Sequence, residues 1–259
     1  MDSAYARKYR ELHDNHWWWQ ARKAEVLRHI RNILGNRTDA SILDIGCGDG
    51  LFFDDLARFG WVEGVEPDER TITQHSRWIN RIHHCFFDDT FQSTRRFDLI
   101  LMLDVLEHLP NQIAALSHIE RLLSPGGVLL LTVPAFNILW TKHDDVNHHH
   151  IRYTRKLLCQ QLMLSGLESV NSHYLFHWLF PLKIAIKIKE YLLRSGPQLP
   201  SVPSDRMNNM LLSLCLSEQG IFSSRHLPWG SSLIAECRSI SGPCTADLVV
   251  AEDYSLAAI

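Results

Sequence analysis

The alternation of apolar and polar residues predicts an α/β protein in which short buried strands alternate with amphipathic helices. Nearly continuous apolar runs are typical of parallel strands buried on both faces, and apolar residues three or four apart indicate a helix with one buried face. Strands are expected at 42–45, 61–66, 82–87, 97–103, 128–134 and 167–174, and helices within 11–34, 51–58, 68–80, 111–123, 154–164 and 206–218. This order predicts a mainly parallel sheet flanked by helices.

A glycine-rich turn follows the first strand, where Asp44 precedes Gly46, Gly48 and Gly50. A strand, a tight turn and a helix form the first unit of a nucleotide-binding α/β domain. A dinucleotide site needs G-x-G-x-x-G, and Leu51 occupies the last glycine position here, which argues against a nicotinamide oxidoreductase. The carboxylate of Asp44 would repel a pyrophosphate but would accept hydrogen bonds through water from an ammonium group. The turn therefore favours a ligand with a cationic end and no phosphate.

This turn resembles the first motif of the class I S-adenosylmethionine-dependent methyltransferases, in particular the bacterial type 11 and type 23 subgroup. Asp-x-Leu-Glu-His-Leu at 104–109 resembles the fourth motif, Leu-x-Pro-Gly-Gly at 123–127 is another feature of the family, and 228–237 resembles its final strand. The resemblance covers roughly residues 11–237. It implies a Rossmann-like seven-stranded sheet with an antiparallel last strand, flanked by helices, and S-adenosylmethionine as cofactor with S-adenosylhomocysteine as product.

The chain is expected to divide into an N-terminal aromatic and helical lid, a cofactor-binding α/β core, a helical insertion that covers the substrate, the final strand and a C-terminal extension. The boundaries of these five parts are 1–38, 39–174, 175–230, 231–237 and 238–259.

Candidate cofactor residues follow the strand ends. Glu66 lies 16 residues after Gly50, near the distance at which nucleotide folds place an acid on the ribose hydroxyls. The resemblance implies that one of the pair Asp88 and Asp89 holds the adenine amine; Asp88 is our first choice, with Asp89 capping the turn. The cofactor-binding residues predicted in this way are Trp18, Arg22, Asp44, Gly46, Cys47, Gly48, Gly50, Glu66, Pro67, Asp88, Leu103, Asp104 and His108.

Two of these assignments have plain alternatives. Trp18 and Arg22 share a helix face and form either a packed N-terminal cap with a solvated arginine or a lid whose arginine faces the methionine carboxylate. His108 either caps the loop before the next helix or lies beside the sulfonium.

The best candidates for substrate chemistry lie in the long loop 135–154, which leaves the fifth strand beside the cofactor crevice. His143 is our first choice for a general base, oriented by Asp144, and His148 is the second. His148, Arg152 and Tyr153 are candidates to orient the acceptor. His143, His148 and Tyr153 are therefore the predicted catalytic residues.

The same loop has two other interpretations. Its histidines and Asp144 are ligand types suited to zinc or iron, but adjacent histidines on an extended chain point in opposite directions, so no metal site is predicted. A packed and solvated connector is the plainer alternative. In the related subgroup an arginine is common at the position of Ile151, which gives this loop a different charge.

Segment 175–193 mixes three lysines with aromatic and aliphatic residues. It is expected either to pack over the active site or to contact a membrane surface or a lipid-linked substrate.

Composition narrows the function. The formal net charge of −3 gives no sign of a nucleic-acid partner. The six cysteines lack C-x-x-C spacing, which favours free thiols, and the first residues lack a signal-peptide pattern, so a cytoplasmic location is expected. The predicted function is methyl transfer to an oxygen or nitrogen of a small-molecule, secondary-metabolite or glycan acceptor. A non-catalytic S-adenosylmethionine-binding subunit is the main alternative.

Overall fold

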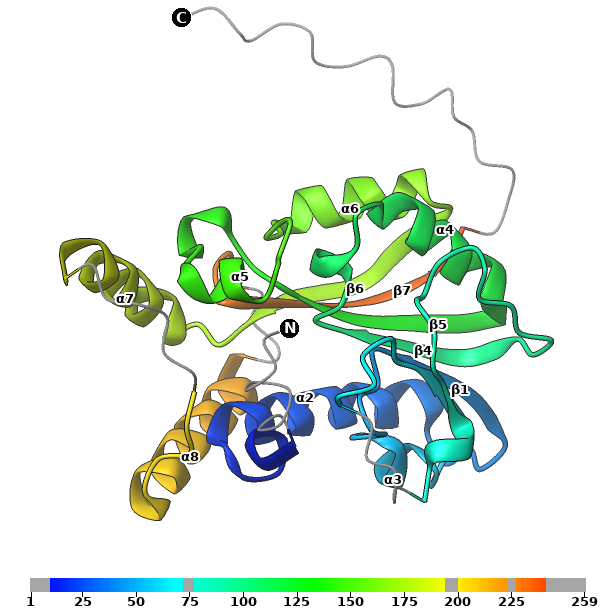
Figure 1. Cartoon of the computed structure of the whole chain (residues 1–259), viewed down its shortest axis with the longest axis horizontal. Coiled ribbons are helices and arrows are strands. Elements are labelled where there is room, and N and C mark those ends of the chain that lie inside the picture. Colours follow the sequence, from blue (N-terminus) through cyan, green and yellow to red (C-terminus); the bar gives the residue numbers. More distant parts are fainter. Residues whose placement is uncertain (1–9, 72–76, 194–199, 223–226, 241–259) are drawn as a thin grey trace, which may run out of the picture.

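The computed structural model describes residues 10–71, 77–193, 200–222 and 227–240. These residues form a seven-stranded sheet in the order β3-β2-β1-β4-β5-β7-β6 (Figure 1). Strand β7 pairs antiparallel with both of its neighbours, while the pairs from β3 to β5 are parallel. The strands are β1 (Ala40–Ile45), β2 (Gly60–Val65), β3 (Ile82–His83), β4 (Phe97–Leu103), β5 (Leu123–Pro134), β6 (Leu167–Leu175) and β7 (Ser232–Ser239).

Helices cover both faces of this sheet (Figure 1). Helices α4 and α6 lie on one face, and α2, α3 and α8 lie on the other, while α5 and α7 lie at one end of the strands. The helices are α2 (Trp17–Leu34), α3 (Phe53–Leu56), α4 (Gln112–Leu122), α5 (Lys142–Val146), α6 (Arg155–Leu164), α7 (Leu179–Leu193) and α8 (Asp205–Phe222), with 3₁₀ turns at Ile79–Arg81, Leu106–His108 and Asn137–Leu139.

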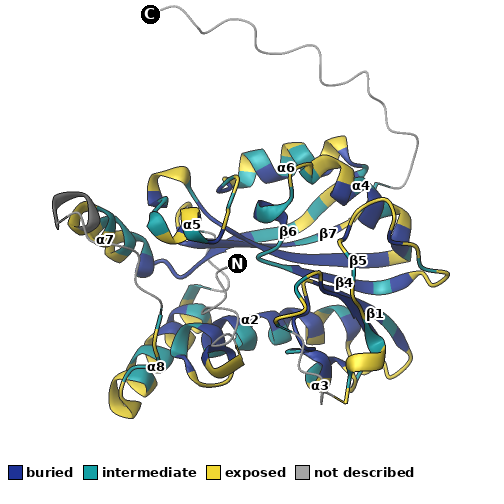
Figure 2. Cartoon of the chain, viewed as in Figure 1, coloured by how far each residue is buried: buried dark blue, intermediate teal, exposed yellow. Residues whose placement is uncertain are grey.

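The core consists of two apolar layers, one on each side of the sheet, because successive residues of a strand point to opposite faces. Ile100 and Leu129 pack in the layer under α4 and α6, whereas Leu101 and Leu130 pack in the layer under α2. These four side chains are fully buried, and Figure 2 shows the central strands buried along most of their length. The continuous apolar runs of the sequence therefore reflect strands that are covered on both faces.

The predicted fold class is confirmed, with several changes in element length. The helix expected at 51–58 contains only Phe53–Leu56, because the glycine turn continues through a hydrogen bond from the Leu51 amide to the Cys47 carbonyl. The strand expected at 82–87 ends at His83, where the Cys85 amide bonds back to the His83 carbonyl. Most of the helix expected at 68–80 falls on 72–76, which lie outside the described residues.

Two strands are also displaced. Strand β5 begins at Leu123, five residues before the expected position, because Leu123 already pairs with Phe97 across an irregular register. Strand β7 covers Ser232–Ser239 rather than 231–237. No helix among the described residues is long and apolar enough to cross a membrane.

Helix α8 returns from the insertion to pack along α2. The Asn208 side chain accepts a hydrogen bond from the Trp17 amide (2.9 Å) and donates one to the Asn15 carbonyl (2.8 Å). The three adjacent tryptophans separate as expected, with Trp17 against Trp178 (ring centroids 5.7 Å apart) and Trp19 in a small cluster with Leu12. The N-terminal helix is therefore held from both the sheet and the insertion.

Candidate active site

The glycine turn and Glu66 form one hydrogen-bonded unit at the ends of β1 and β2. The Gly48 amide donates to Glu66 Oε2 (3.0 Å), and the Asp68 amide donates to Glu66 Oε1 (2.9 Å). Gly46 and Gly50 have φ angles of 75° and 84°, a region that favours glycine. A Cβ on Gly46 would lie 2.4 Å from the Val105 side chain, so the turn has no room for a larger residue.

Two buried groups lie at the base of this turn. Asp44 is 2% exposed, and burial raises its pKa to about 8, although the positive charge of Arg22 opposes the shift. Burial also raises the pKa of the neighbouring Cys47 thiol, whose Sγ lies 3.5 Å from the Gly48 carbonyl oxygen. Cys47 is therefore an inert part of the turn, whereas Asp44 is a carboxyl group whose ionisation a nearby cation would favour.

Arg22 connects α2 to the ends of β4 and β5. Its Nη2 lies 2.8 Å from Asp104 Oδ2 and 2.9 Å from Thr132 Oγ1, and the Thr132 hydroxyl donates to Asp104 Oδ1 (3.0 Å). The guanidinium carbon is 5.8 Å from the Trp18 ring centroid, as their shared helix face predicts. Arg22 is only 5% exposed, so the alternative of a solvated arginine is wrong.

The end of β4 has an unusual backbone. Asp104 has a φ angle of 56°, which is uncommon for a residue other than glycine, and its amide donates to the Thr132 carbonyl (2.9 Å). Leu103 and Asp104 are both half-buried at this edge. Strained backbone at a strand end is frequent in functional sites, because packing must hold it in place.

The residues predicted around the adenine are more exposed. Asp88 and Pro67 are exposed. Asp88 Oδ1 accepts from the Thr90 amide (2.9 Å) and the Thr90 hydroxyl (2.6 Å), so Asp88 performs the turn capping expected of Asp89. The predicted contact of Asp88 with the adenine amine stays a prediction.

Glu107, His108 and His149 form a cluster beside this edge. Their ligand atoms lie within 4.8 Å of one another, close enough to hold a divalent ion. Burial raises the pKa of Glu107 well above its ordinary value, and neither carboxylate oxygen has a hydrogen-bond partner among the described residues. Burial lowers the pKa of His108 to about 4, so its ring is neutral at pH 7. Of the histidines considered as metal ligands in the sequence, only His149 belongs to this cluster, together with Glu107 and His108.

A buried ion pair organises the loop 135–154, which is called the acceptor loop below. Arg152 Nε and Nη2 donate to the two carboxylate oxygens of Asp144 (2.8 and 2.9 Å), and Arg152 Nη1 donates to the Ala135 carbonyl (3.1 Å). The Thr141 amide and His149 Nδ1 lie 2.8 Å from the same carboxylate. Although burial opposes ionisation, the hydrogen bonds from His149 and Arg152 hold the pKa of Asp144 well below its usual range. Asp144 therefore orients Arg152 and His149, and its predicted part in orienting His143 stays a prediction.

The three predicted catalytic residues have different environments. His143 is exposed on α5 with Nε2 3.0 Å from Asn147 Nδ2, and reduced hydration lowers the pKa of its ring. His148 is exposed, with a φ angle of 57°. Tyr153 is completely buried in the core, and burial beside Glu107 raises the pKa of its hydroxyl. Tyr153 is therefore part of the core, and its predicted role toward an acceptor stays a prediction.

Three further residues of the site were missed by sequence reasoning. Thr132 joins Arg22 to Asp104, and Arg10 forms an ion pair with Asp49 over the glycine turn. Burial lowers the pKa of Lys183 on α7 to about 8, and Arg152 and Asp144 are among the charges that act on it. Only Thr132, a polar residue within an apolar strand, carried a signal in the sequence. Arg10 and Lys183 reach the site through tertiary packing, which the sequence pattern does not reveal.

A family model described as a methyltransferase domain matches residues 18–172, more than half of the chain. The chain belongs to this methyltransferase family. The resemblance to class I S-adenosylmethionine-dependent methyltransferases is thereby confirmed, and S-adenosylmethionine is the cofactor of this family.

The curated relatives of this chain align with it over only part of their own length. A ubiquinone biosynthesis O-methyltransferase from Bradyrhizobium diazoefficiens is 28% identical over 165 residues, which are 54% of this chain and 64% of the relative. One of the same name from Coxiella burnetii is 27% identical over 146 residues, covering 51% and 62%. The chain thus spans less than two thirds of these relatives.

Solved structures share the fold at low identity. A methyltransferase from Archaeoglobus fulgidus superposes with a TM-score of 0.52 at 16% identity, covering 84% of this chain and 92% of that one. A phosphoethanolamine N-methyltransferase from Haemonchus contortus, solved with S-adenosylmethionine, gives 0.54 at 16% identity over 84% and 53%. The [4+2]-cyclase SpnF gives 0.53 at 17% identity over 86% and 83%. These similarities establish the fold.

Proposed function

We propose that this chain transfers a methyl group from S-adenosylmethionine to an oxygen, or less favourably a nitrogen, of a small organic acceptor. The observation that carries the proposal is the junction of Arg22, Asp104 and Thr132, which joins the N-terminal helix to the strand ends where parallel sheets bind their ligands. The acceptor loop begins immediately after β5, at the same edge. The proposed cofactor and acceptor regions thus share one edge of the sheet.

The residues present suit this cofactor. Arg22 Nε is buried and has no hydrogen-bond partner among the described residues, which suits the carboxylate of the methionine moiety. Asp44 would face the ammonium group, and each Glu66 oxygen keeps a lone pair for a ribose hydroxyl beside the backbone bonds that it already accepts. Trp18, Leu103 and His108 would line the remainder, with Pro67 and Asp88 toward the adenine. When bound, the cofactor supplies an electrophilic methyl carbon on a sulfonium.

The protein's own task is to align the acceptor, exclude water and take up a proton. His143 is proposed to accept that proton at a ring nitrogen, since its depressed pKa keeps the imidazole neutral at pH 7. Arg152 is held in place by Asp144 and would fix the shape of the loop, while Lys183 would add a positive charge beside the acceptor. A phenol or carboxylate needs less help from a base than an alcohol does.

The class of acceptor is supported by the relatives and by α7. The relatives named above are O-methyltransferases of ubiquinone biosynthesis, which favours an oxygen acceptor. Leu182 and Ile186 are 44% and 41% exposed one turn apart on α7, and the Lys187 ammonium donates to the Ile138 carbonyl in the acceptor loop (2.9 Å). An apolar surface over the loop suits an apolar acceptor. Secondary-metabolite and glycan oxygens remain the other acceptors to test.

The first experiment is calorimetric titration of the full chain with S-adenosylmethionine, S-adenosylhomocysteine and NAD. We expect micromolar binding of the first two and none of NAD. A screen with methyl-labelled donor then compares phenolic, carboxylate, amine and glycan acceptors. Binding without transfer to any acceptor would favour a non-catalytic or differently reacting protein, and the SpnF similarity shows that the fold alone does not assure methyl transfer. Absence of binding would refute the cofactor site.

Contact with a membrane surface through 175–193 is a separate part of the proposal. Lysines beside exposed aliphatic residues favour anionic lipid. The chain should co-sediment with anionic vesicles at low salt, and Ile186→Ser should reduce the bound fraction. Leu164→Ser on α6, where Leu164 is 69% exposed, is the matched control. Absence of the chain from the vesicle pellet would remove this contact.

A further inference from the structure

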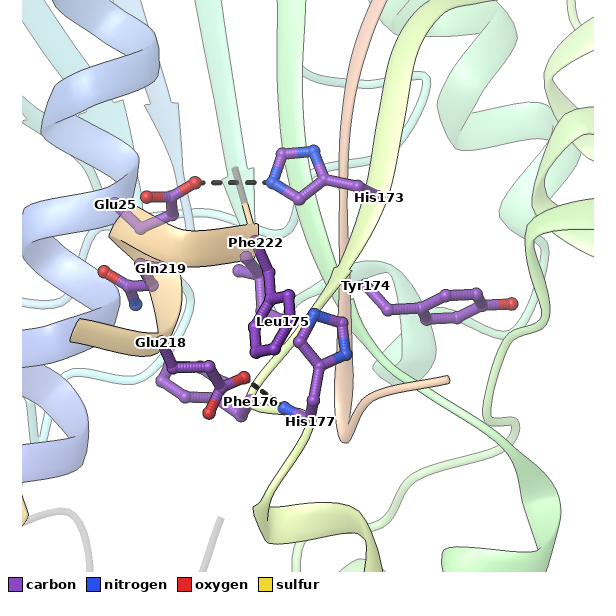
Figure 3. Close-up of a pocket in the computed structure, with 9 residues that line it drawn as sticks. All are labelled: Glu25, His173, Tyr174, Leu175, Phe176, His177, Glu218, Gln219 and Phe222. Atoms are coloured by element: carbon purple, nitrogen blue, oxygen red, sulfur yellow. Dashed lines mark hydrogen bonds and ion pairs between the residues drawn. The ribbon is translucent and has the colours of Figure 1, made fainter. Parts of the chain in front are cut away.

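A buried cluster of titratable side chains lies away from the cofactor edge, where α2 meets β6 and β7. Glu25 and His29 come from α2 and His173 from β6, and they are 3%, 2% and 6% exposed. Glu236 of β7 borders the cluster. Figure 3 shows Glu25 and His173 pointing toward each other across the boundary between the helix and the sheet.

Two separations within this cluster are those of a tetrahedral ion site. Glu25 Oε1 lies 3.3 Å from His29 Nε2 and 3.3 Å from His173 Nε2, and the ligand atoms of all three residues lie within 4.8 Å of one another. Zinc binds nitrogen and oxygen ligands at about 2.0–2.2 Å, so neighbouring ligands of a tetrahedral site lie roughly 3.3–3.6 Å apart. The observed separations therefore need little rearrangement to admit such an ion.

The outer carboxylate orients one of the ligands. His29 Nδ1 is hydrogen-bonded to Glu236, so in the neutral ring the proton on Nδ1 is held by Glu236, and Nε2, 3.3 Å from Glu25 Oε1, is the nitrogen that can bind an ion. Histidines that bind metals in proteins usually donate their other ring nitrogen to a carboxylate in this way. The four side chains thus supply two nitrogens, one oxygen and an orienting group.

The cluster adjoins a recess that is partly open to solvent. Glu25 and His173 line this recess together with Glu218, His177 and Gln219 of the facing elements (Figure 3). Glu218 is 7% exposed, and its Oε2 is buried without a hydrogen-bond partner among the described residues. A recess bordered by two carboxylates attracts a cation.

Arg28 is the competing cation. Its guanidinium contacts Glu25 and lies 3.3 Å from His29 Nε2, but its side chain is 39% exposed. It approaches from the solvent side and can turn outward when an ion binds.

We propose that Glu25, His29 and His173 bind a divalent transition-metal ion of the zinc type, with Glu236 as the residue that orients His29. The ion would fasten α2 to β6. Because Glu25 follows Arg22 by three residues on the same helix, the ion would also stabilise the helix that carries Arg22 to the cofactor edge. This site is distinct from the cluster of Glu107, His108 and His149.

The test uses the full chain, stripped with a chelator and titrated with Zn²⁺ by calorimetry and with Co²⁺ by visible absorption. We expect one Zn²⁺ site that is lost in His173→Ala, with tetrahedral Co²⁺ bands lost in parallel. His177→Ala, in the same recess but outside the cluster, should bind like the native chain. His149→Ala reports on the other cluster and should leave this site intact.

Glu236→Gln is a second variant that keeps all three ligands and the packing. It should weaken Zn²⁺ binding by about 10- to 100-fold, as loss of an orienting partner does. Unchanged stoichiometry and affinity in His173→Ala, unchanged affinity in Glu236→Gln, or no Zn²⁺ binding by the native chain would overturn the proposal. Circular dichroism of each variant shows that it is folded, and Zn²⁺ should raise the melting temperature of the native chain but not of His173→Ala.

Discussion

Arg22 Nη2 lies 2.8 Å from Asp104 Oδ2, although 82 residues separate the two side chains in the sequence. Arg22→Ala removes this pair and the bond to Thr132. We expect the melting temperature to fall, and affinity for S-adenosylmethionine to weaken by about 1–3 kcal/mol, since bonds to a charged group are lost. Arg31→Ala, at an exposed position on the same helix, is the control. If calorimetry gives both variants the same affinity for S-adenosylmethionine, Arg22 does not bind the cofactor.

Glu66 is expected to bind the cofactor in addition to stabilising the glycine turn. Glu66→Gln keeps the shape of the side chain and one acceptor oxygen, whereas Glu66→Ala removes both. We expect Glu66→Ala to weaken cofactor binding by about 1–3 kcal/mol and Glu66→Gln to weaken it less. The Glu69 side chain is 84% exposed, so the control variant Glu69→Ala should bind the cofactor normally. Titration with S-adenosylhomocysteine measures all three, and an unchanged Glu66→Ala affinity would contradict the ribose assignment.

His143→Ala tests the proposed base. Cofactor affinity should remain, and turnover should fall by about 10²- to 10⁴-fold for an acceptor that needs deprotonation. His148→Ala should have a smaller effect, because His143 is the preferred base, and His150→Ala is a control on the exposed side of the loop. Turnover with the acceptor found in the screen is the measurement. If His143→Ala keeps the native turnover, His143 is not the general base.

His16 should make the N-terminal helix sensitive to acid. Its Nδ1 accepts a hydrogen bond from the Trp18 amide (3.2 Å), and burial lowers its pKa from 6.5 to about 4. The folded state therefore binds this proton less readily than the unfolded state does. The contribution of His16 to stability is fully present above pH 6.5 and is lost as the pH falls toward 4, at up to about 1.4 kcal/mol per pH unit.

His16→Asn isolates this effect, because asparagine caps a helix without titrating. Urea unfolding of both proteins at several pH values gives the difference in stability. That difference should shift in favour of His16→Asn below pH 6.5. A difference that stays constant with pH would exclude His16 as the titrating group.

Much of the fold and of the cofactor turn could be predicted from the sequence. The apolar runs of β1, β4 and β5 identified central strands, because a strand covered on both faces has few polar positions. The glycine spacing after Asp44 identified the family and the turn. The ends of elements were less accurate, as at α3 and β3, because single backbone bonds at Leu51 and Cys85 set them.

The candidate acceptor site depended on tertiary structure. The sequence placed His143 next to Asp144, yet the Asp144 carboxylate binds Arg152, eight residues away, because the loop folds back on itself after α5. Tyr153 was expected at the acceptor and lies in the core. The partners of a loop side chain depend on the path of the loop. Hydrophobic periodicity carries no information about that path.

The sequence by itself determined the class of fold, the position of the glycine turn and the family, since these follow from local periodicity and from residue types at fixed spacing. Only the tertiary structure brought Arg22 to Asp104 and Thr132, and Glu25 and His29 to His173 and Glu236. These residues come from elements far apart in the chain. Their contacts exist because α2 packs across the sheet, and the sum of many apolar contacts, rather than any local motif, fixes that packing.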